Sequence, residues 1–215
     1  MKLMNRLERW MYRFQVRPFF QYLVFAMAGV YALTLFVPRF NLYGQLALYT
    51  PLVFQGQLWR LLTFLILPPM GSPLSVILTL YFYYFIGTTL ENRWGARRFL
   101  LFYGIGAVGA ILAGLLTQIG TNHYLYMSMF FAFAVMQPET EVLLFFVLPV
   151  KVKWLALLNA AYFVYEFVVG SMPIRAAILF SVAVIILFFG GDLLNLARSE
   201  VEQFRRKQRF RKLSK

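Results

Sequence analysis

The chain has 215 residues, of which 61% are hydrophobic and only 13% are charged, and its mean hydropathy is +0.68. A soluble domain is typically about half apolar and a quarter charged, so this composition excludes an ordinary soluble protein and indicates one polytopic membrane domain. The lack of cysteine excludes disulfides, thiolate chemistry and cysteine-based metal sites, and we expect no metal and no cofactor. The formal charge is +13, but most basic residues lie in the terminal segments or beside apolar runs, which favours anionic lipid over specific nucleic acid.

Residues 1–17 form a basic segment in front of the first apolar run. Leu3, Leu7 and Trp10 recur at helical spacing with arginines between them, which predicts an interfacial helix on the cytoplasmic leaflet. Residues 19–37 are long enough to span a bilayer and lack a small-residue cleavage site. We therefore expect a retained first helix rather than a cleaved signal peptide.

A long connector, residues 40–73, separates this helix from the second span. Its apolar stretch 61–67 is too short to cross a bilayer, which predicts a re-entrant or interfacial segment. Trp59 and Arg60 come directly before it and are expected to anchor the loop at the outer interface. Irregular backbone at membrane depth survives only where protein or a water-filled cavity satisfies it, so this loop is expected to be functional.

The remaining apolar runs predict five further spans, at residues 74–90, 99–119, 124–136, 152–169 and 174–191. The run 124–136 is markedly short and is followed by Pro138. We expect residues 18–197 to form one all-α membrane domain of six helices, and residues 198–215 to form a basic tail.

The distribution of basic residues predicts the orientation of this domain. In the six-span arrangement both termini lie on one side, together with 18 of the 21 Lys and Arg residues. Arg39, Arg60 and Arg175 remain on the other side. The positive-inside rule then places both termini in the cytoplasm, and the compact loops favour a bacterial plasma membrane.

Small residues are concentrated in the run 99–119. Its segment 104–109 even matches G-x-G-x-x-G, but a dinucleotide site would need a preceding strand and a polar cleft. The spacing of Gly104, Gly106, Gly109 and Gly114 instead predicts close packing of helix backbones in lipid.

Polar residues form a stripe on the fifth predicted span, where Asn159, Tyr162 and Glu166 stand at i, i+3 and i+7. Ionisable residues inside a membrane are costly and commonly functional. Two interpretations stay open: Glu166 pairs with Arg175 across the short turn that follows, or the stripe faces a client protein.

Two paired motifs carry a family resemblance. The segments 57–63 and 90–99 resemble the rhomboid superfamily in a Trp-Arg signature in the first loop and a Glu-x-x-x-Gly signature ending the second span. The signature residues are Trp59, Arg60, Glu91 and Gly95. The resemblance covers roughly residues 17–198 and implies a six-helix rhomboid-like bundle with a long first loop, an enclosed fourth helix and cytoplasmic termini. The segment 68–71, Pro-Pro-Met-Gly, is similar to Derlins, the non-proteolytic branch of the superfamily.

Active rhomboids use a serine in a Gly-x-Ser-Gly turn before the fourth helix and a histidine on the sixth helix. The matching positions of this chain hold His123 and Phe188, so the resemblance implies no catalytic dyad. Ser128 is the alternative serine, but its flanks are bulky and it lies about 140° round one helix from His123. We expect the Ser128 hydroxyl to bond its own helix backbone.

The resemblance thus implies a pseudoprotease that binds transmembrane segments of client proteins and perturbs the surrounding bilayer. One alternative is an active rhomboid intramembrane serine protease with atypical catalytic residues. Another is a lipid-handling or transporter-like membrane protein, although the sequence has no inverted repeat and few intramembrane charges.

Overall fold

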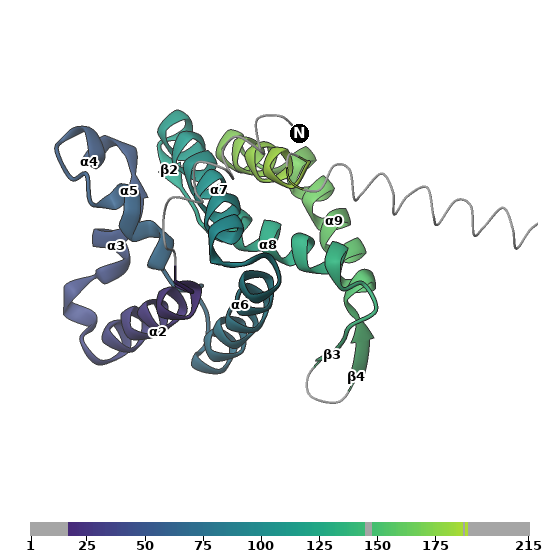
Figure 1. The fold of residues 1–215 in the computed structure, drawn as a ribbon. Helices are drawn as coiled ribbons and strands as arrows, with labels where there is room; N and C mark the ends of the chain where they lie inside the picture. The colour runs from purple at the N-terminus through teal and green to yellow at the C-terminus, as the bar shows by residue number, and fades with distance from the viewer. Residues whose placement is uncertain (1–16, 145–147, 187, 189–215) are drawn as a thin grey trace, which may run out of the picture.

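The computed structural model describes residues 17–144, 148–186 and 188, and these residues are mostly helical (Figure 1). Within this part, length and composition suit three helices for crossing a membrane: α6 (Pro73–Trp94), α7 (Ala96–Thr117) and α9 (Val152–Val169). Shorter apolar helices accompany them: α2 (Phe20–Phe36), α8 (His123–Met136) and the helix Met172–Ile186. The predicted interfacial helix up to residue 16 and the predicted tail 198–215 lie outside the described residues.

Local sequence sets the ends of the longest helices. The Ser72 side chain accepts a hydrogen bond from the Ser75 backbone N–H, and Pro73 occupies the first turn of α6. Gly95 ends α6 and precedes α7 with φ 78° and ψ 150°, a conformation that essentially only glycine adopts. The glycine of the Glu-x-x-x-Gly signature therefore allows the sharp turn between two antiparallel helices.

The predicted long connector between α2 and α6 is folded into short elements beside α2 (Figure 1). These are η1 (Pro38–Phe40), α3 (Leu42–Leu46), β1 (Leu48–Tyr49), α4 (Thr50–Phe54), α5 (Arg60–Thr63) and η2 (Phe64–Ile66). β1 pairs antiparallel with β2 (Ile119–Gly120), the segment between α7 and α8. Most of the apolar stretch 61–67 thus forms two short helical turns, α5 and η2, and the preceding strand β1 joins this loop to the bundle by pairing with β2.

The expectation of an all-α protein is wrong in one detail, because two small β-sheets accompany the helices. Besides the β1–β2 pair, β3 (Glu141–Leu144) and β4 (Leu148–Lys151) form an antiparallel hairpin between α8 and α9. Pro149 cannot donate a backbone hydrogen bond and would break a helix interior, but it fits a strand with a free edge. The apolar run after Glu141 therefore forms strands instead of extending a helix.

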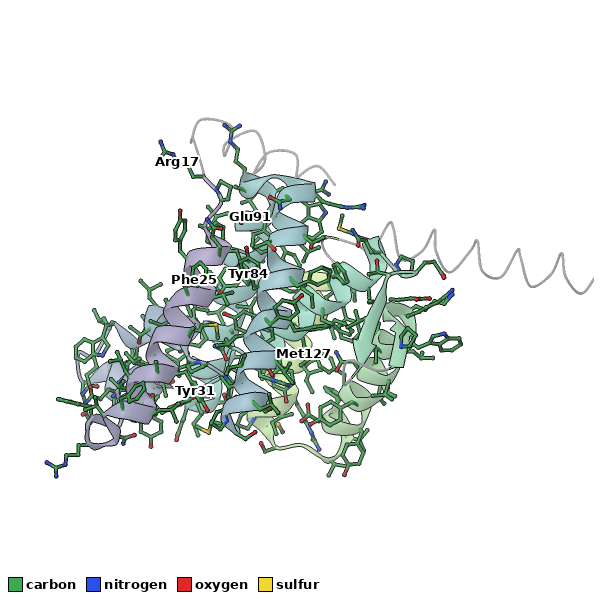
Figure 2. All side chains as sticks on the ribbon, turned by 90° about the horizontal axis from the view of Figure 1, so that it is seen from below. Arg17, Phe25, Tyr31, Tyr84, Glu91 and Met127 are labelled. Atoms are coloured by element: carbon green, nitrogen blue, oxygen red, sulfur yellow. The ribbon has the colours of Figure 1, made fainter. Side chains whose placement is uncertain are left out.

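Contacts between helix ends show that α2, α6 and α7 alternate in direction. The start of α2 meets the end of α6, where the Phe19 N–H donates to Glu91. At the other end, the Thr50 N–H donates to the carbonyl of Gln118, which follows α7. Figure 2 shows Arg17 and Glu91 at one end of the bundle and Tyr31 toward the other.

Helix α8 occupies the centre of the bundle, as the resemblance led us to expect. Nine of its 14 residues are buried, compared with two of 18 in α9. It packs against α6, α7 and α9, whereas α6 and α9 do not pack extensively against each other. Of the α7 glycines, Gly106 faces α8, where a Cβ would collide with the Leu125 side chain, whereas Gly109 faces Phe180 and Gly104 has open space beside it.

Candidate functional site

His123 and Phe188, which the resemblance matches to the catalytic pair of active rhomboids, pack against different parts of the bundle. His123 begins α8, directly beyond β2 and the end of α7, and its ring lies edge-on to Tyr124 at 5.2 Å. Phe188 packs edge-on against Phe102, which belongs to the first half of α7, at 5.2 Å. An aromatic hydrocarbon ring neither accepts nor donates a proton, so Phe188 contributes only packing at this position.

The two buried serines near the centre of the bundle bond to backbone carbonyls. Ser128 Oγ donates to the carbonyl of Leu125 at 2.6 Å, which confirms the predicted bond to its own helix. Ser181 Oγ donates to the carbonyl of Tyr124 at 2.8 Å and ties the helix Met172–Ile186 to α8. Such hydroxyls add interhelical or local bonds in an apolar interior and satisfy their own polar atoms.

Arg60 holds the first loop together from a buried position. Its side chain is only 4% exposed, and Nη1 donates to the carbonyls of Gly44 and Ala47, each at 2.7 Å. Its Nε donates to Gln57 Oε1 at 2.7 Å. A guanidinium is suited to the last carbonyls of α3 because the C-terminal end of a helix is partly negative. Trp59 is 54% exposed beside it, so of the two signature residues Arg60 carries the internal contacts.

Glu91 caps a helix that has no cap of its own. Its Oε1 accepts from the Phe19 N–H at 2.8 Å and its Oε2 from the Phe20 N–H at 3.4 Å. No side chain of α2 itself caps this N-terminus. A carboxylate there satisfies orphan backbone donors and opposes the partial positive charge of the helix end. Glu91 therefore joins α2 to α6 and has a structural role.

Of the two interpretations that the sequence left open for Glu166, the pairing with Arg175 is wrong. The Glu166 carboxylate accepts from Tyr124 at 2.9 Å and from Tyr162 at 2.7 Å. Arg175 turns to the end of α9 and donates from Nη2 to the carbonyl of Val168 at 2.9 Å. Glu166 therefore holds α9 to α8 through Tyr124, while Tyr162 bonds the same carboxylate from within α9.

Asn159, the third member of the stripe, lines a half-open pocket of about 240 Å³. The pocket is bounded by α6, α8 and α9, and its wall includes Tyr83, Tyr126 and Leu155. Asn159 Nδ2 donates to the thioether of Met127 at 3.3 Å, its one hydrogen bond within the described residues (Met127 is labelled in Figure 2). A thioether is a weak acceptor, so this amide retains most of its capacity to bond a partner.

Sequence reasoning missed a group of tyrosines between the pocket and the first loop. The Tyr126 hydroxyl donates to the carbonyl of Leu65 at 2.9 Å and lies 3.3 Å from the hydroxyl of Tyr103. The ring of Tyr83 stacks on that of Tyr126 with centroids 4.3 Å apart. Tyrosines inside apolar runs resemble ordinary core residues in the sequence, and only their hydroxyl partners distinguish them.

Asn122, just before α8, makes a second contact to the first loop that the sequence analysis did not predict. Its Nδ2 donates to the carbonyls of Phe64 at 2.9 Å and Leu67 at 3.0 Å. Asn122 precedes His123, the residue that the resemblance matches to the family's serine, and its amide satisfies backbone carbonyls in and just after the η2 turn. The first loop is thereby attached to the start of α8.

No protein-family model and no curated protein matches the chain. Across residues 17–144, 148–186 and 188, no three His, Cys, Asp or Glu side chains gather as a metal site would require. The candidate site is therefore defined by its own geometry: a pocket at the α6–α8–α9 junction with one weakly engaged amide in its wall.

Proposed function

We propose that this protein is a rhomboid-like membrane pseudoprotease that binds transmembrane segments of client proteins. The binding site is the pocket between α6 and α9, with α8 as its floor. The observation that carries the proposal is Asn159, whose amide faces this pocket and is bonded only to the sulfur of Met127 within the described residues.

The pocket offers a client both apolar area and one polar contact. Aromatic and aliphatic side chains such as Phe82, Ile86 and Leu155 form most of its wall. In lipid, helices associate through close packing and interhelical hydrogen bonds, and a single such bond contributes about 0.6 to 2 kcal/mol. Asn159 lies near the middle of α9, so it would meet a polar residue at the centre of a client helix.

Access to the pocket from the lipid is supported by the weak attachment of α9. α9 buries only Val152 and Phe163, and it does not pack extensively on α6. A client helix approaching in the membrane plane would therefore displace few protein contacts. The short outer helix α2 supports a second element of the proposal, because it buries only three of its residues and is about 26 Å long against a hydrocarbon core of about 30 Å. A bundle with short helices thins the adjacent bilayer, which lowers the cost of moving polar client residues.

The proposal includes six membrane passes with both termini in the cytoplasm of a bacterial cell and the basic ends on anionic lipid. Support comes from the alternating direction of α2, α6 and α7 and from the 18 of 21 basic residues that this arrangement gathers on one side. Among the described residues, Arg93 near the end of α6 and Arg97 near the start of α7 lie on the proposed cytoplasmic side.

Photo-crosslinking with designed peptides tests the binding site. A photoreactive residue at Leu155, which lines the pocket, should capture a leucine-based transmembrane peptide with one central Asn. The matched control is Leu158, which is 70% exposed on the same helix and does not line the pocket. Asn159→Leu should lower capture of the Asn-containing peptide about five-fold, as expected for one hydrogen bond of about 1 kcal/mol, and leave an all-leucine peptide unchanged. Equal capture at both positions would contradict the proposal.

A separate measurement tests the lack of proteolysis. We expect no cleavage of a generic rhomboid substrate and no labelling by a serine-directed fluorophosphonate, because the Ser128 hydroxyl is bonded to its own helix. Labelling that disappears in Ser128→Ala would establish a serine hydrolase and overturn the pseudoprotease proposal.

A further inference from the structure

A second hollow lies on the opposite flank of α9 from the Asn159 pocket. It has a volume of about 470 Å³ and is bounded by α8, α9 and the helix Met172–Ile186. Every residue that lines it is aliphatic or aromatic, including Phe131, Phe163, Leu179 and Val182. Its surface therefore suits a hydrocarbon chain and offers no hydrogen bond to a peptide.

Arg175 stands at one end of this groove. Arg175, Leu179, Val182 and Ile186 follow one another at i, i+4, i+7 and i+11, so they share one face of their helix. One nitrogen of the guanidinium bonds the carbonyl of Val168, but Nε is buried and has no hydrogen-bond partner in the described part of the chain. That atom is enclosed by protein, so an incoming group meets the outer nitrogens of the guanidinium, and a phosphate oxygen is an acceptor that fits them well.

We propose that the groove binds one phospholipid, with an acyl chain along α9 and the phosphate on Arg175. The length agrees with this occupant. From Arg175 to Ile186 the helix rises about 16 Å, and the hydrocarbon of one leaflet is about 15 Å deep. If Arg175 lies at the level of the headgroups, the apolar residues that line the groove lie beside the acyl chain of a lipid in the same leaflet.

This site is independent of the proposed client site. The two hollows lie on different flanks of α9 and share no lining residue. A client helix is a poorer occupant of the second groove, because Arg175 would still lack an anionic partner and the groove would give the client backbone no polar contact. A lipid without phosphate would fill the groove but leave the guanidinium unpaired.

Native mass spectrometry of the purified, delipidated protein tests the proposal. Titration with phosphatidylglycerol should give a one-lipid complex, and diacylglycerol with the same chains should bind at least ten-fold more weakly. Arg175→Gln should weaken phosphatidylglycerol binding about ten-fold, whereas Arg175→Lys, which keeps the charge, should weaken it less. Two groove-filling variants, Leu179→Trp and Ala160→Phe, should reduce binding without changing helical content in circular dichroism.

Two controls separate this site from general lipid association. Arg39→Gln changes an exposed arginine at the same end of the bundle, and Asn159→Leu changes the other pocket; both should bind as the wild type does. The proposal is overturned if Arg175→Gln or both filled variants bind like the wild type. Equal binding of diacylglycerol, or an equal loss in Arg39→Gln, would also overturn it.

Discussion

The two sides of α8 differ in how completely their polar groups are satisfied. On the side of the first loop, Arg60, Asn122 and Tyr126 each donate to backbone carbonyls of that loop. On the side of α9, Glu166 is satisfied by two tyrosines, but Asn159 has only a sulfur acceptor and Arg175 keeps one buried nitrogen unpaired within the described residues. Both hollows also lie on that second side.

This difference indicates that the two sides of α8 have different roles. In an apolar environment, a satisfied polar network fixes one arrangement of the chain, while a group with spare bonding capacity lowers its free energy by binding something else. The first-loop side is therefore expected to be rigid, and the α9 side to be the place where lipids or other helices bind.

The largest expected effect follows from removing the Arg60 side chain, which would break hydrogen bonds on the first-loop side of α8. Arg60→Ala should lower the free energy of unfolding by about 3 kcal/mol, because three charge-assisted hydrogen bonds disappear and carbonyls of Gly44 and Ala47 lose their donor. SDS titration of the protein in mixed micelles measures this change. Arg39→Ala, at an exposed position, is the control and should change stability by less than about 0.5 kcal/mol. A loss below about 1 kcal/mol for Arg60→Ala would show that the loop is held by other contacts.

Enlarging one alanine in the buried centre and one beside the open groove compares how tightly the two regions are packed. Ala132 on α8 is fully buried, so Ala132→Leu should cost about 2 kcal/mol through overpacking. Ala160 lines the open groove beside α9, so Ala160→Leu should change stability by less than about 0.5 kcal/mol. Unfolding in the same SDS titration gives both values. Similar costs at the two positions would mean that the α9 side is as tightly packed as the centre.

The smallest expected effect concerns the segment between α8 and α9 that carries the hairpin. Glu139 forms ion pairs with Lys151 at 2.7 Å and Lys153 at 2.5 Å, and these hydrogen bonds lower the pKa of its carboxyl from 4.5 to about 2. A lowered folded-state pKa means that the ion pairs add stability above pH 4.5 and lose it as the pH falls toward 2. The group is fully exposed, so the effect on overall stability should be slight.

Carboxyl chemical shifts of the labelled protein test this prediction. The Glu139 midpoint should lie well below 4.5 in the wild type and return toward 4.5 when Lys151 and Lys153 are both changed to Gln. A wild-type midpoint near 4.5 would show that the two lysines do not hold the carboxylate in solution.

Hydropathy and helix-end signals predicted much of this fold. The predicted spans 74–90 and 152–169 correspond to helices Pro73–Trp94 and Val152–Val169, because apolar length and flanking Pro, Gly and Lys are local features. The hairpin after α8 was not predicted, since its strands form only by pairing with each other. The pairing of Glu166 with Arg175, one of two interpretations that the sequence left open, is wrong, because two tyrosines compete for the carboxylate and the end of α9 competes for the cation.

By itself the sequence determined that the chain is an apolar, helical, basic-ended protein, and it marked Arg60, Glu91 and Gly95 as positions with special roles. Composition and periodicity suffice for this, since burial in lipid selects helices wherever the chain is apolar for long enough. Only the tertiary structure decided which polar groups are satisfied. Arg60 donates three hydrogen bonds to oxygen atoms and Asn159 donates one to a sulfur, because their partners come from segments brought together by packing around α8.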